Sequence, residues 1–379
     1  MKIGIITLPF NNNYGGVLQA YALQSALRRQ GHEVITIYRH NPIMPFHIRV
    51  LSSLNRLFKS IRSRKSMVIR SWATTREELI IEGHINRFIR ENISTTPLFK
   101  NERDFAGLSV YGFDAYIVGS DQVWRSKYSP SLRNHFFGFI NDADKTRRIS
   151  YAASFGVENW EFTQGQTREC SKLVSMFNAV SVREDSAVQL CKENLGIDAV
   201  QVLDPTMLIE KEEYISLVER DKIAPCNGTL LTYVLDKSPA KQEFIRQVET
   251  AKNLKSVSIM PKLLFRDAGI KKIADTIYPP VTEWIRGFMD AEYVITDSYH
   301  GMVFAIIFNK PFLALGNTKR GMARFLSLLR LFNLEERMAI STDEKLMDKL
   351  LTPIDFDRVN MILKIKKEES LLFLKNSLK

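Results

Sequence analysis

Short apolar runs that suit β-strands alternate with helical patterns along most of this chain, and no other feature constrains its fold as strongly. In the first 220 residues, helical segments separate several of these runs. Such alternation is typical of parallel sheets that are covered by helices on both faces. The strands expected in this first series are 2–8, 33–38, 115–120, 149–155, 179–183 and 199–203, and its first helix is 17–29.

A second series of the same kind follows a polar stretch at 221–228. The sequence therefore predicts an α/β protein with two Rossmann-like domains facing a cleft, one over 1–220 and one over 221–350. In the remaining tail, 351–379, a helix at about 355–378 is expected to cross back to the first domain. The strands expected in the second series are 230–235, 256–260, 276–279, 293–296 and 311–315, and its helices are 241–251, 282–289 and 302–308.

The composition is that of an ordinary globular chain, since 45% of the 379 residues are hydrophobic and 25% are charged. No apolar run approaches the roughly 20 residues that are needed to span a bilayer. The apolar stretch before Pro9 is also too short for the core of a secretory signal. Cys170, Cys191 and Cys226 have no metal-ligand spacing, so we expect a cytoplasmic chain with reduced thiols and no metal site.

Positive charge concentrates in one insertion, 39–76, within a chain of formal net charge +11. No Asp or Glu lies between Glu33 and Glu77, and apolar residues recur at helical steps over 47–69. This pattern predicts an amphipathic helix with a basic opposite face. The helix either packs on its own domain or lies on anionic lipid at the inner face of the cell membrane. Nucleic acid is not an expected partner, because no recognised binding motif accompanies the charge.

Four polar segments stand just beyond expected strands, where ligands bind in open α/β sheets. The first contains Asn13, Tyr14, Gly15 and Gly16 and precedes the first helix. Free amides at a helix start suit an anionic or hydroxyl-rich ligand, although a plain turn explains a glycine pair equally well. We treat these four residues as candidate acceptor-binding residues.

The second and third segments bring carboxylates and an arginine to strand ends. Asp121 is expected at a helix start, where it either caps the helix or acts on a substrate hydroxyl beside Trp124, whose ring suits a sugar face. Arg183 ends a strand, and its guanidinium suits a two-point contact with carboxylate or phosphate. Glu184 opens the next helix and is, with Asp121, a candidate acid or base.

The fourth segment, 296–301, places His300 and Gly301 at the start of an apolar helix, with Ser298 two residues before His300. Imidazole, hydroxyl and backbone amides converge there in the manner of an anion site. His300 is therefore a candidate both for binding an anionic ligand and for catalysis, and Ser298 and Gly301 are candidates for binding it.

Together, five short segments resemble the polysaccharide pyruvyl transferase family. They follow one another in the order found in that family and cover roughly residues 1 to 316. The basic insertion and the tail after about 340 lie outside the resemblance. The matching segments are 14–23 (YGGVLQAYAL), 119–124 (GSDQVW), 181–184 (SVRE), 203–206 (LDPT) and 296–301 (TDSYHG).

The resemblance implies a fold similar to the two-domain GT-B glycosyltransferases, with the acceptor on the first domain and the donor on the second. It implies phosphoenolpyruvate as donor, a sugar as acceptor and no metal or other cofactor. The commonest product in the family is a 4,6-ketal on a hexose of a polysaccharide precursor. The family ties an arginine after a strand and a histidine before glycine to donor binding, and here these positions are Arg183 and His300.

One position departs from the family pattern. Some members carry an arginine where this chain has Ser298, so part of the donor's negative charge needs another cation. The candidates are Lys262, Arg266, Lys319 and Arg320.

Two other functions remain open from the sequence. One is a glycosyltransferase that uses a nucleotide sugar on the same fold, and the other is a non-enzymatic module that binds glycan or membrane. The basic insertion also suits an acceptor that is carried on a lipid diphosphate.

Overall fold

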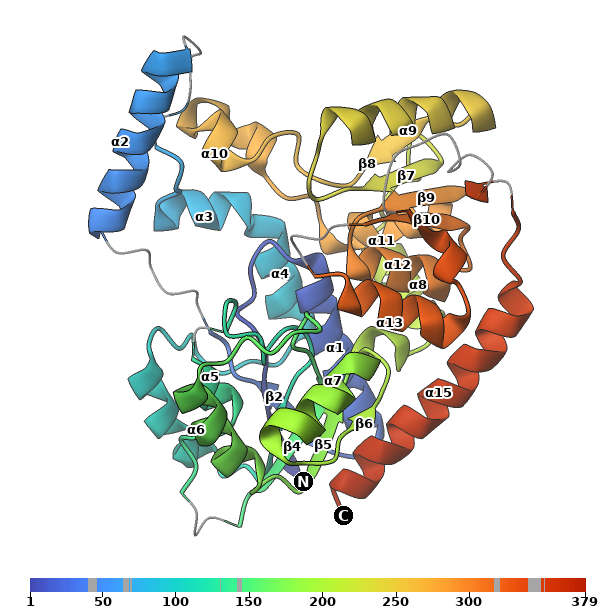
Figure 1. Ribbon diagram of the computed structural model, residues 1–379. Coiled ribbons are helices and arrows are strands. Elements are labelled where there is room, and N and C mark those ends of the chain that lie inside the picture. The colour runs from blue at the N-terminus through green and yellow to red at the C-terminus, as the bar shows by residue number, and fades with distance from the viewer. Residues whose placement is uncertain are drawn as a thin grey trace.

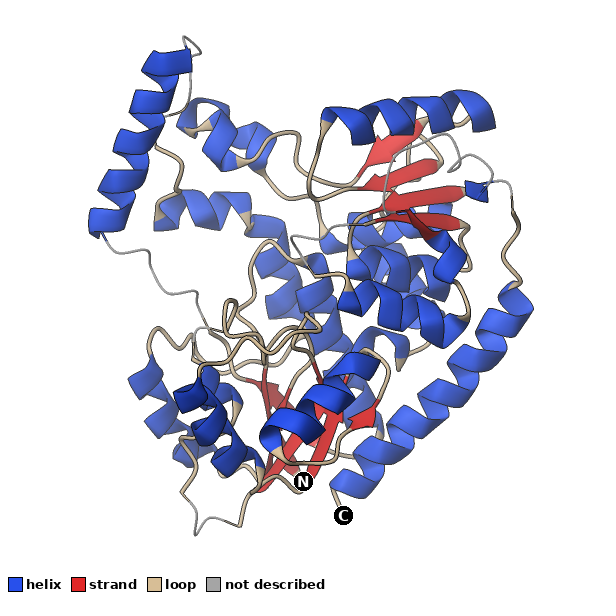
Figure 2. Ribbon diagram, in the orientation of Figure 1, coloured by secondary structure: helices blue, strands red, loops and turns tan. Residues whose placement is uncertain are grey.

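Two parallel sheets form the frame of the protein (Figures 1 and 2). The computed structural model describes residues 1–39, 46–63, 68, 70–129, 131–141, 145–316, 321–339, 349–350 and 352–379. The first sheet has six strands in the order β2-β1-β3-β4-β5-β6, and the second has five in the order β11-β10-β9-β7-β8. The α/β architecture with two parallel sheets is confirmed.

The first sheet is built from apolar runs that are buried at its centre. Its strands are β1 (Lys2–Ile6), β2 (Glu33–Thr36), β3 (Ala115–Val118), β4 (Arg147–Ala153), β5 (Ala179–Val182) and β6 (Val200–Gln201). The helices of this part are α1 (Tyr14–Arg29), α2 (Phe46–Ser63), α3 (Thr75–Ile81), α4 (Gly83–Asn92), α5 (Leu132–His135), α6 (Gln164–Val174) and α7 (Asp185–Leu190).

The second sheet is shorter and is surrounded by the more apolar helices of the chain. Its strands are β7 (Leu230–Tyr233), β8 (Ser256–Ser258), β9 (Tyr293–Thr296), β10 (Phe312–Leu315) and β11 (Met338–Ala339). The helices that follow the first sheet are α8 (Lys211–Arg220), α9 (Pro239–Lys252), α10 (Phe265–Ala268), α11 (Val281–Asp290), α12 (Tyr299–Ile307), α13 (Ala323–Phe332) and α15 (Phe356–Ser377).

One expected strand, 276–279, is wrong. This segment carries no strand. The fifth strand of the second sheet is instead β11, which comes last in the sequence and lies at the edge of the sheet. Pro279 and Pro280 cannot donate to a strand ladder. The Tyr278 N–H donates instead to the Ile81 carbonyl at the end of α3, at 3.0 Å. The segment therefore joins the two halves of the molecule rather than widening a sheet.

Contacts between the halves are extensive. The helix α8, which a boundary at 220 assigns to the first unit, packs on the second through the rings of Tyr214 and Phe304, 5.0 Å apart. The helix α15 runs along the outside of both units (Figure 1). Within it the Ser370 hydroxyl accepts from the Leu203 N–H at 3.0 Å, and the Ser377 carbonyl accepts from Arg147. These contacts tie the end of the chain to the first unit.

Among the described residues, the structure contains no helix that is both long and apolar enough to cross a bilayer.

Candidate active site

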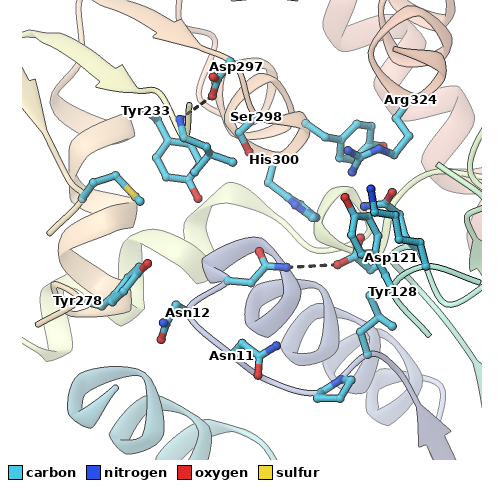
Figure 3. Close-up of a pocket in the computed structure, with 18 of the residues that line it drawn as sticks. Asn11, Asn12, Asp121, Tyr128, Tyr233, Tyr278, Asp297, Ser298, His300 and Arg324 are labelled. Carbon is cyan, nitrogen blue, oxygen red and sulfur yellow. Dashed lines mark hydrogen bonds between the residues drawn. The ribbon is translucent and has the colours of Figure 1, made fainter. Parts of the chain in front are cut away.

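A pocket of about 560 Å³ lies between the two sheets, at the carboxyl ends of β1, β3, β7 and β9 (Figure 3). His300 reaches into it from α12, while Asn11 and Asn12 face it from the loop before α1. Both halves of the molecule contribute side chains, as the prediction of a cleft requires. The residues that line it are Leu8, Pro9, Asn11, Asn12, Asn13, Asp121, Gln122, Lys127, Tyr128, Tyr233, Leu235, Met260, Leu264, Tyr278, Asp297, Ser298, Tyr299, His300 and Arg324.

His300 lies in the first turn of α12, two residues after the N-cap residue Ser298. The residue is 5% exposed, and its Nε2 lies 3.6 Å from a carboxylate oxygen of Asp204. Asp204 follows β6 and begins the short helix Pro205–Met207, so the first unit supplies the carboxylate that faces this imidazole. Asp204 belongs to the segment 203–206 that resembles the family, but the sequence analysis predicted no role for it.

Two glycines let the polypeptide approach His300 closely. A Cβ atom on Gly15 would stand 2.0 Å from His300 Nδ1, so only glycine fits at this point of α1. A Cβ on Gly301 would stand 2.1 Å from the Thr296 hydroxyl, so Gly301 seats the start of α12 on the end of β9. Gly301 does not line the pocket, and both glycines act on the position of the histidine.

Asp121 does not begin a helix. It lies in an irregular segment after β3 with a φ of 68°, in the left-handed region that Asp tolerates better than most residues. Its backbone carbonyl accepts from the Ser154 N–H at 3.1 Å, and its carboxylate accepts from Asn13 Nδ2 at 3.3 Å. The helix-cap alternative is therefore wrong for Asp121, and its carboxylate lines the pocket.

Arg183 lies behind the pocket wall and not in it. It is 4% exposed, and its guanidinium contacts three carboxylates: Asp204 at 2.8 Å, Glu184 at 3.3 Å and Asp121 at 3.6 Å. The Tyr299 ring covers it at 4.3 Å from the ring centroid and separates it from the pocket. Arg183 therefore holds the carboxylates and Tyr299 in place.

The buried carboxylates of this cluster differ in their proton affinity. Burial raises the pKa of Glu184, although the Arg183 charge and a hydrogen bond from Ser154 oppose the rise. Burial also disfavours the charged form of Asp204, but the neighbouring His300 and Arg183 outweigh it and hold the pKa of Asp204 well below its usual range. Asp204 is thus ionised at neutral pH, and its negative charge faces the His300 imidazole.

One buried cation at the pocket was not singled out from the sequence: Arg324, in the first turn of α13. It lines the pocket, and its guanidinium carbon lies 5.9 Å from the Tyr299 ring centroid. Burial and the neighbouring Arg183 lower the pKa of Arg324 to about 10, so it keeps its charge at neutral pH. Lys262 and Arg266 line an adjoining pocket instead. Lys319 and Arg320 lie outside the described residues.

Several predicted acceptor-binding residues lie away from the pocket. The Trp124 side chain has no exposed surface; it stacks on Phe136, and its Nε1–H donates to the His135 carbonyl. A sugar has no access to this ring, so the expectation of a Trp124 contact is corrected: Trp124 serves the core. Tyr14 is also buried and donates to the Pro279 carbonyl at 2.9 Å.

Of the expected acceptor residues, Asn13 alone lines the pocket. Gly16 supports it, because the Gly16 N–H donates to Asn13 Oδ1 at 3.1 Å. Glu184 does not line the pocket; its contacts are with Arg183 and Ser154. The sequence did not single out the tyrosines of the lining, which are Tyr128, Tyr233, Tyr278 and Tyr299.

Asp297 is a further residue whose role the sequence did not reveal. Its carboxylate accepts from the Leu235 and Asp236 N–H groups at 2.6 and 3.1 Å, and from Lys241 Nζ at 2.6 Å. The charge of Asp297 is thereby satisfied inside the protein. Asp297 fixes the loop after β7 against the loop after β9 and shapes the pocket.

The comparison with protein families shows which family the chain belongs to. A family model described as polysaccharide pyruvyl transferase matches residues 13–319. The chain belongs to the polysaccharide pyruvyl transferase family. The matched region contains Asn13, Asp121, Arg183 and His300 and most of the residues that line the pocket, whereas Arg324 and the lining residues before Asn13 lie outside it.

Solved structures share the fold of this pyruvyl transferase family member. UGT89C1 of Arabidopsis thaliana, complexed with quercetin, superposes with a TM-score of 0.50 at 10% identity, covering 100% of this chain and 99% of that one. The UDP-N-acetylglucosamine 2-epimerase of Rickettsia bellii gives a TM-score of 0.49 at 12% identity, covering 100% and 97%. The fold is GT-B-like. No curated protein gives a significant sequence match.

Proposed function

We propose that the protein transfers the pyruvyl group of phosphoenolpyruvate to a sugar of a polysaccharide precursor, forming a ketal and releasing phosphate. One observation carries the proposal: His300, Arg324 and the first turn of α12 converge on a pocket to which both units contribute. Phosphoenolpyruvate bears a phosphate and a carboxylate on one carbon atom. A guanidinium, an imidazole and the positive end of a helix suit that pair of anionic groups.

The reaction balances without a metal or another cofactor. A proton adds to the methylene carbon of the donor, which makes C2 electrophilic, and one sugar hydroxyl adds to C2. The bond from C2 to the phosphate oxygen then breaks, and a second hydroxyl closes the ketal. The two sugar hydroxyls release two protons. The methylene carbon gains one of them as it becomes a methyl group, and the leaving phosphate gains the other.

The residues at the pocket divide this work. Arg324, the Ser298 hydroxyl and the helix amides hold the donor, because negative charge grows on the leaving phosphate. His300 gives the phosphate its proton, and Asp204 stabilises the charged imidazole. Asp121 takes a proton from the attacking hydroxyl. Arg183 and Glu184 act from behind the wall by positioning Asp121 and Asp204.

The opposite wall suits a sugar. Asn11, Asn12 and Asn13 offer amide groups to hydroxyls, and Tyr233 and Tyr278 offer ring faces at the far side of the pocket (Figure 3). We propose a 4,6-ketal on a hexose, since these two hydroxyls close a six-membered ring. The product would belong to a surface polysaccharide such as a capsule or exopolysaccharide.

We also propose that the enzyme works on the cytoplasmic side of the membrane and docks there through α2. Figure 1 shows this helix standing apart from both sheets. Among its described side chains the apolar ones are exposed, Phe58 by 67% and Leu51 by 57%. Two arginines face inward: Arg56 donates to the Val68 and Arg266 carbonyls at 2.8 and 2.7 Å, and Arg49 covers the Trp72 ring.

An anionic lipid surface suits α2 better than a second copy of the chain. No Asp or Glu lies between Glu33 and Glu77, where nine Lys and Arg residues fall. A charge that faces an anionic membrane contributes about 1 kcal/mol. Arg39, Arg49, Arg56 and Arg70 do not count toward this, because they contact the protein. In a symmetric dimer, by contrast, the same patch would meet itself, so the two acid-free segments would repel one another.

Thermal unfolding tests the donor assignment. Phosphoenolpyruvate should raise the melting temperature of the protein, because a ligand at about 100 times its Kd stabilises the folded state by about 2.7 kcal/mol. The His300→Ala variant should lose this stabilisation. A variant of the exposed His84, His84→Ala, is the matched control and should keep it.

Two outcomes would contradict the proposal. Stabilisation by a nucleotide sugar, with none by phosphoenolpyruvate, would identify a glycosyltransferase on this fold. Equal stabilisation of His300→Ala and the parent protein by phosphoenolpyruvate would remove His300 from the donor site.

A further inference from the structure

One lysine that lines the pocket of His300 has no role in the proposed reaction. Lys127 comes from the first unit, in the segment after Asp121, whereas Arg324 and His300 come from the second. Within the part of the chain that the structure describes, its ammonium group forms neither an ion pair nor a hydrogen bond. Most exposed lysines are solvated surface groups. A role for Lys127 therefore requires both a fixed backbone and a pocket that needs its charge.

A tight turn fixes the backbone on the N-terminal side of Lys127. The Tyr128 N–H donates to the Arg125 carbonyl at 3.0 Å, so Lys127 is the third residue of a four-residue turn. The buried Arg125 side chain lies 3.2 Å from Glu161 and 4.8 Å from the centroid of the Tyr128 ring. Figure 3 shows Tyr128 on the same side of the pocket as Asp121. Lys127 thus stands between two residues that contact one another.

Ser129 fixes the other end of this segment through the buried His135. Arg39 lies 2.9 Å from His135 Nε2, and a guanidinium can only donate, so Nε2 is the acceptor. Burial and the Arg39 charge hold the pKa of His135 well below its usual range, which leaves the ring neutral at neutral pH. Its proton is therefore on Nδ1, which donates to the Ser129 hydroxyl at 2.6 Å. Lys127 lies on a segment that is anchored at both ends.

The donor brings more negative charge than Arg324 alone can balance. Phosphoenolpyruvate carries a carboxylate and a phosphate with a charge of about −1.5 to −2 at neutral pH. Asp121 lines the same pocket as Arg324. Its partner Arg183 also serves Asp204 and Glu184, so Asp121 keeps negative charge at the pocket. The charges of Arg324 and Asp121 therefore offset one another.

The other charged groups of the described lining leave Lys127 as the unmatched cation. Asp297 is held by Lys241, with Nζ 2.6 Å from the carboxylate. His300 faces Asp204, with its Nε2 3.6 Å from the carboxylate. Lys127 has no such neighbour, so its charge is available to an anionic ligand.

We propose that Lys127 is a donor-binding residue of the first unit and contacts an anionic group of phosphoenolpyruvate. This inference rests on the proposed function and extends the donor site across the junction of the two units. A lysine suits the position, because a compact charge on a flexible chain reaches the donor without the fixed geometry of a guanidinium. The donor is then held by both units at once.

Calorimetric titration with phosphoenolpyruvate tests the contact. The Lys127→Met variant keeps most of the apolar chain but loses the charge, so it should bind the donor at least about tenfold more weakly than the parent protein. Lys127→Arg keeps the charge and should retain most of the affinity. The control Lys172→Met removes another exposed lysine of the first unit and should bind as the parent does. Equal affinity of Lys127→Met and the parent would overturn the proposal, as would an equal loss in Lys127→Met and Lys127→Arg.

Inorganic phosphate identifies which group of the donor Lys127 contacts. If Lys127→Met loses affinity for inorganic phosphate as much as for phosphoenolpyruvate, the contact is with the phosphate. If it loses affinity for phosphoenolpyruvate alone, the contact is with the carboxylate. Both results support a donor contact.

The Ser129→Ala variant tests whether the anchored segment positions Lys127. Loss of the hydroxyl removes the hydrogen bond from His135, so binding of phosphoenolpyruvate should weaken in Ser129→Ala. The same change should add nothing in the Lys127→Met background, because the two residues act through one contact. Equal weakening in both backgrounds would overturn the positioning role of Ser129.

The His300→Ala variant separates this inference from the proposed function. Phosphoenolpyruvate that binds the parent and Lys127→Met equally, but not His300→Ala, would remove Lys127 from the donor site and leave the proposed function standing. A parent protein that does not bind phosphoenolpyruvate would overturn both. The two failures are therefore distinguishable.

Discussion

Three carboxylates share the buried guanidinium of Arg183, and this arrangement explains how a pocket for an anionic donor tolerates acidic neighbours. Asp204, Glu184 and Asp121 lie within 3.6 Å of Arg183, and Tyr299 covers the group on the pocket side. Leaving a buried carboxylate unpaired would cost several kcal/mol. Because Arg183 is engaged in this way, we propose that the donor contacts Arg324 and His300 instead.

Replacing Arg324 tests that division of work. The Arg324→Lys variant keeps a positive charge but loses the planar fork, so the KM for phosphoenolpyruvate should rise about tenfold or more, in line with about 1.5–3 kcal/mol for a hydrogen bond to a charged group. The exposed Arg330 lies on the same helix and pairs with Asp185 at the surface, so Arg330→Lys is the control. Steady-state kinetics on both variants supply the comparison, and an unchanged KM in Arg324→Lys would exclude a donor contact.

Sequence position located these residues only in part. Asp121 and His300 both reach the pocket because each follows a strand whose carboxyl end faces the space between the two sheets. The same rule misplaced Trp124, since it identifies the end of a strand but not the direction of a side chain. This rule did not find Arg324, because the helix that carries Arg324 is brought to the pocket by tertiary packing.

At the scale of elements, α2 departs most from the ordinary surface helix. The three- and four-residue spacing predicted a helix, and the structure has it at Phe46–Ser63. The spacing does not reveal which face packs inward. Here Arg49 and Arg56 satisfy backbone and aromatic partners of the protein, which leaves the apolar face outward. That orientation depends on partners distant in sequence, such as Arg266.

Removing the apolar face of α2 should abolish membrane docking. In the triple variant Leu51→Ser/Leu54→Ser/Phe58→Ser, flotation with vesicles of anionic lipid should recover little protein, because the apolar area that anchors the helix is gone. Binding of the parent protein should also weaken as salt is raised, since exposed charges are screened beyond about 8 Å at physiological ionic strength.

The control removes equally exposed apolar side chains elsewhere, in Val110→Ser/Val200→Ser/Met361→Ser, and should float as the parent does. Both triple variants should still be stabilised by phosphoenolpyruvate, because none of the six positions lines the pocket. Flotation of the α2 variant at the level of the parent would show that α2 is not the docking element.

At the scale of the whole molecule, the active site is a property of the junction between two units. The alternation of strands and helices predicted two parallel sheets and a cleft, and the structure has both. What the alternation could not predict is how the units are joined. That depends on single contacts, such as the Tyr14 hydroxyl on the Pro279 carbonyl and the Tyr14 ring on Trp284. Prolines at 279 and 280 turned an apparent strand into part of this junction.

Gly15 approaches His300 closely at the junction, and this contact yields a test of the whole arrangement. In the Gly15→Ala variant the new Cβ would stand 2.0 Å from His300 Nδ1 and 2.2 Å from its Cγ. Either the imidazole or the two units must shift, because the ring is buried and the helix start is fixed. Overpacking of this kind costs about 1–3 kcal/mol. We therefore expect a lower melting temperature together with a lower kcat.

The matched control is Gly83→Ala, at the first position of α4, where no atom lies within 4 Å of the added Cβ. Alanine is a better helix former than glycine by about 1 kcal/mol, so this variant should be at least as stable as the parent and equally active. If Gly15→Ala matched Gly83→Ala in both melting temperature and kcat, the contact between α1 and α12 would not constrain His300. A loss of kcat with an unchanged melting temperature would instead show that the imidazole moves while the junction holds. The two measurements thus separate the placement of the catalytic histidine from the docking of the units that create its pocket.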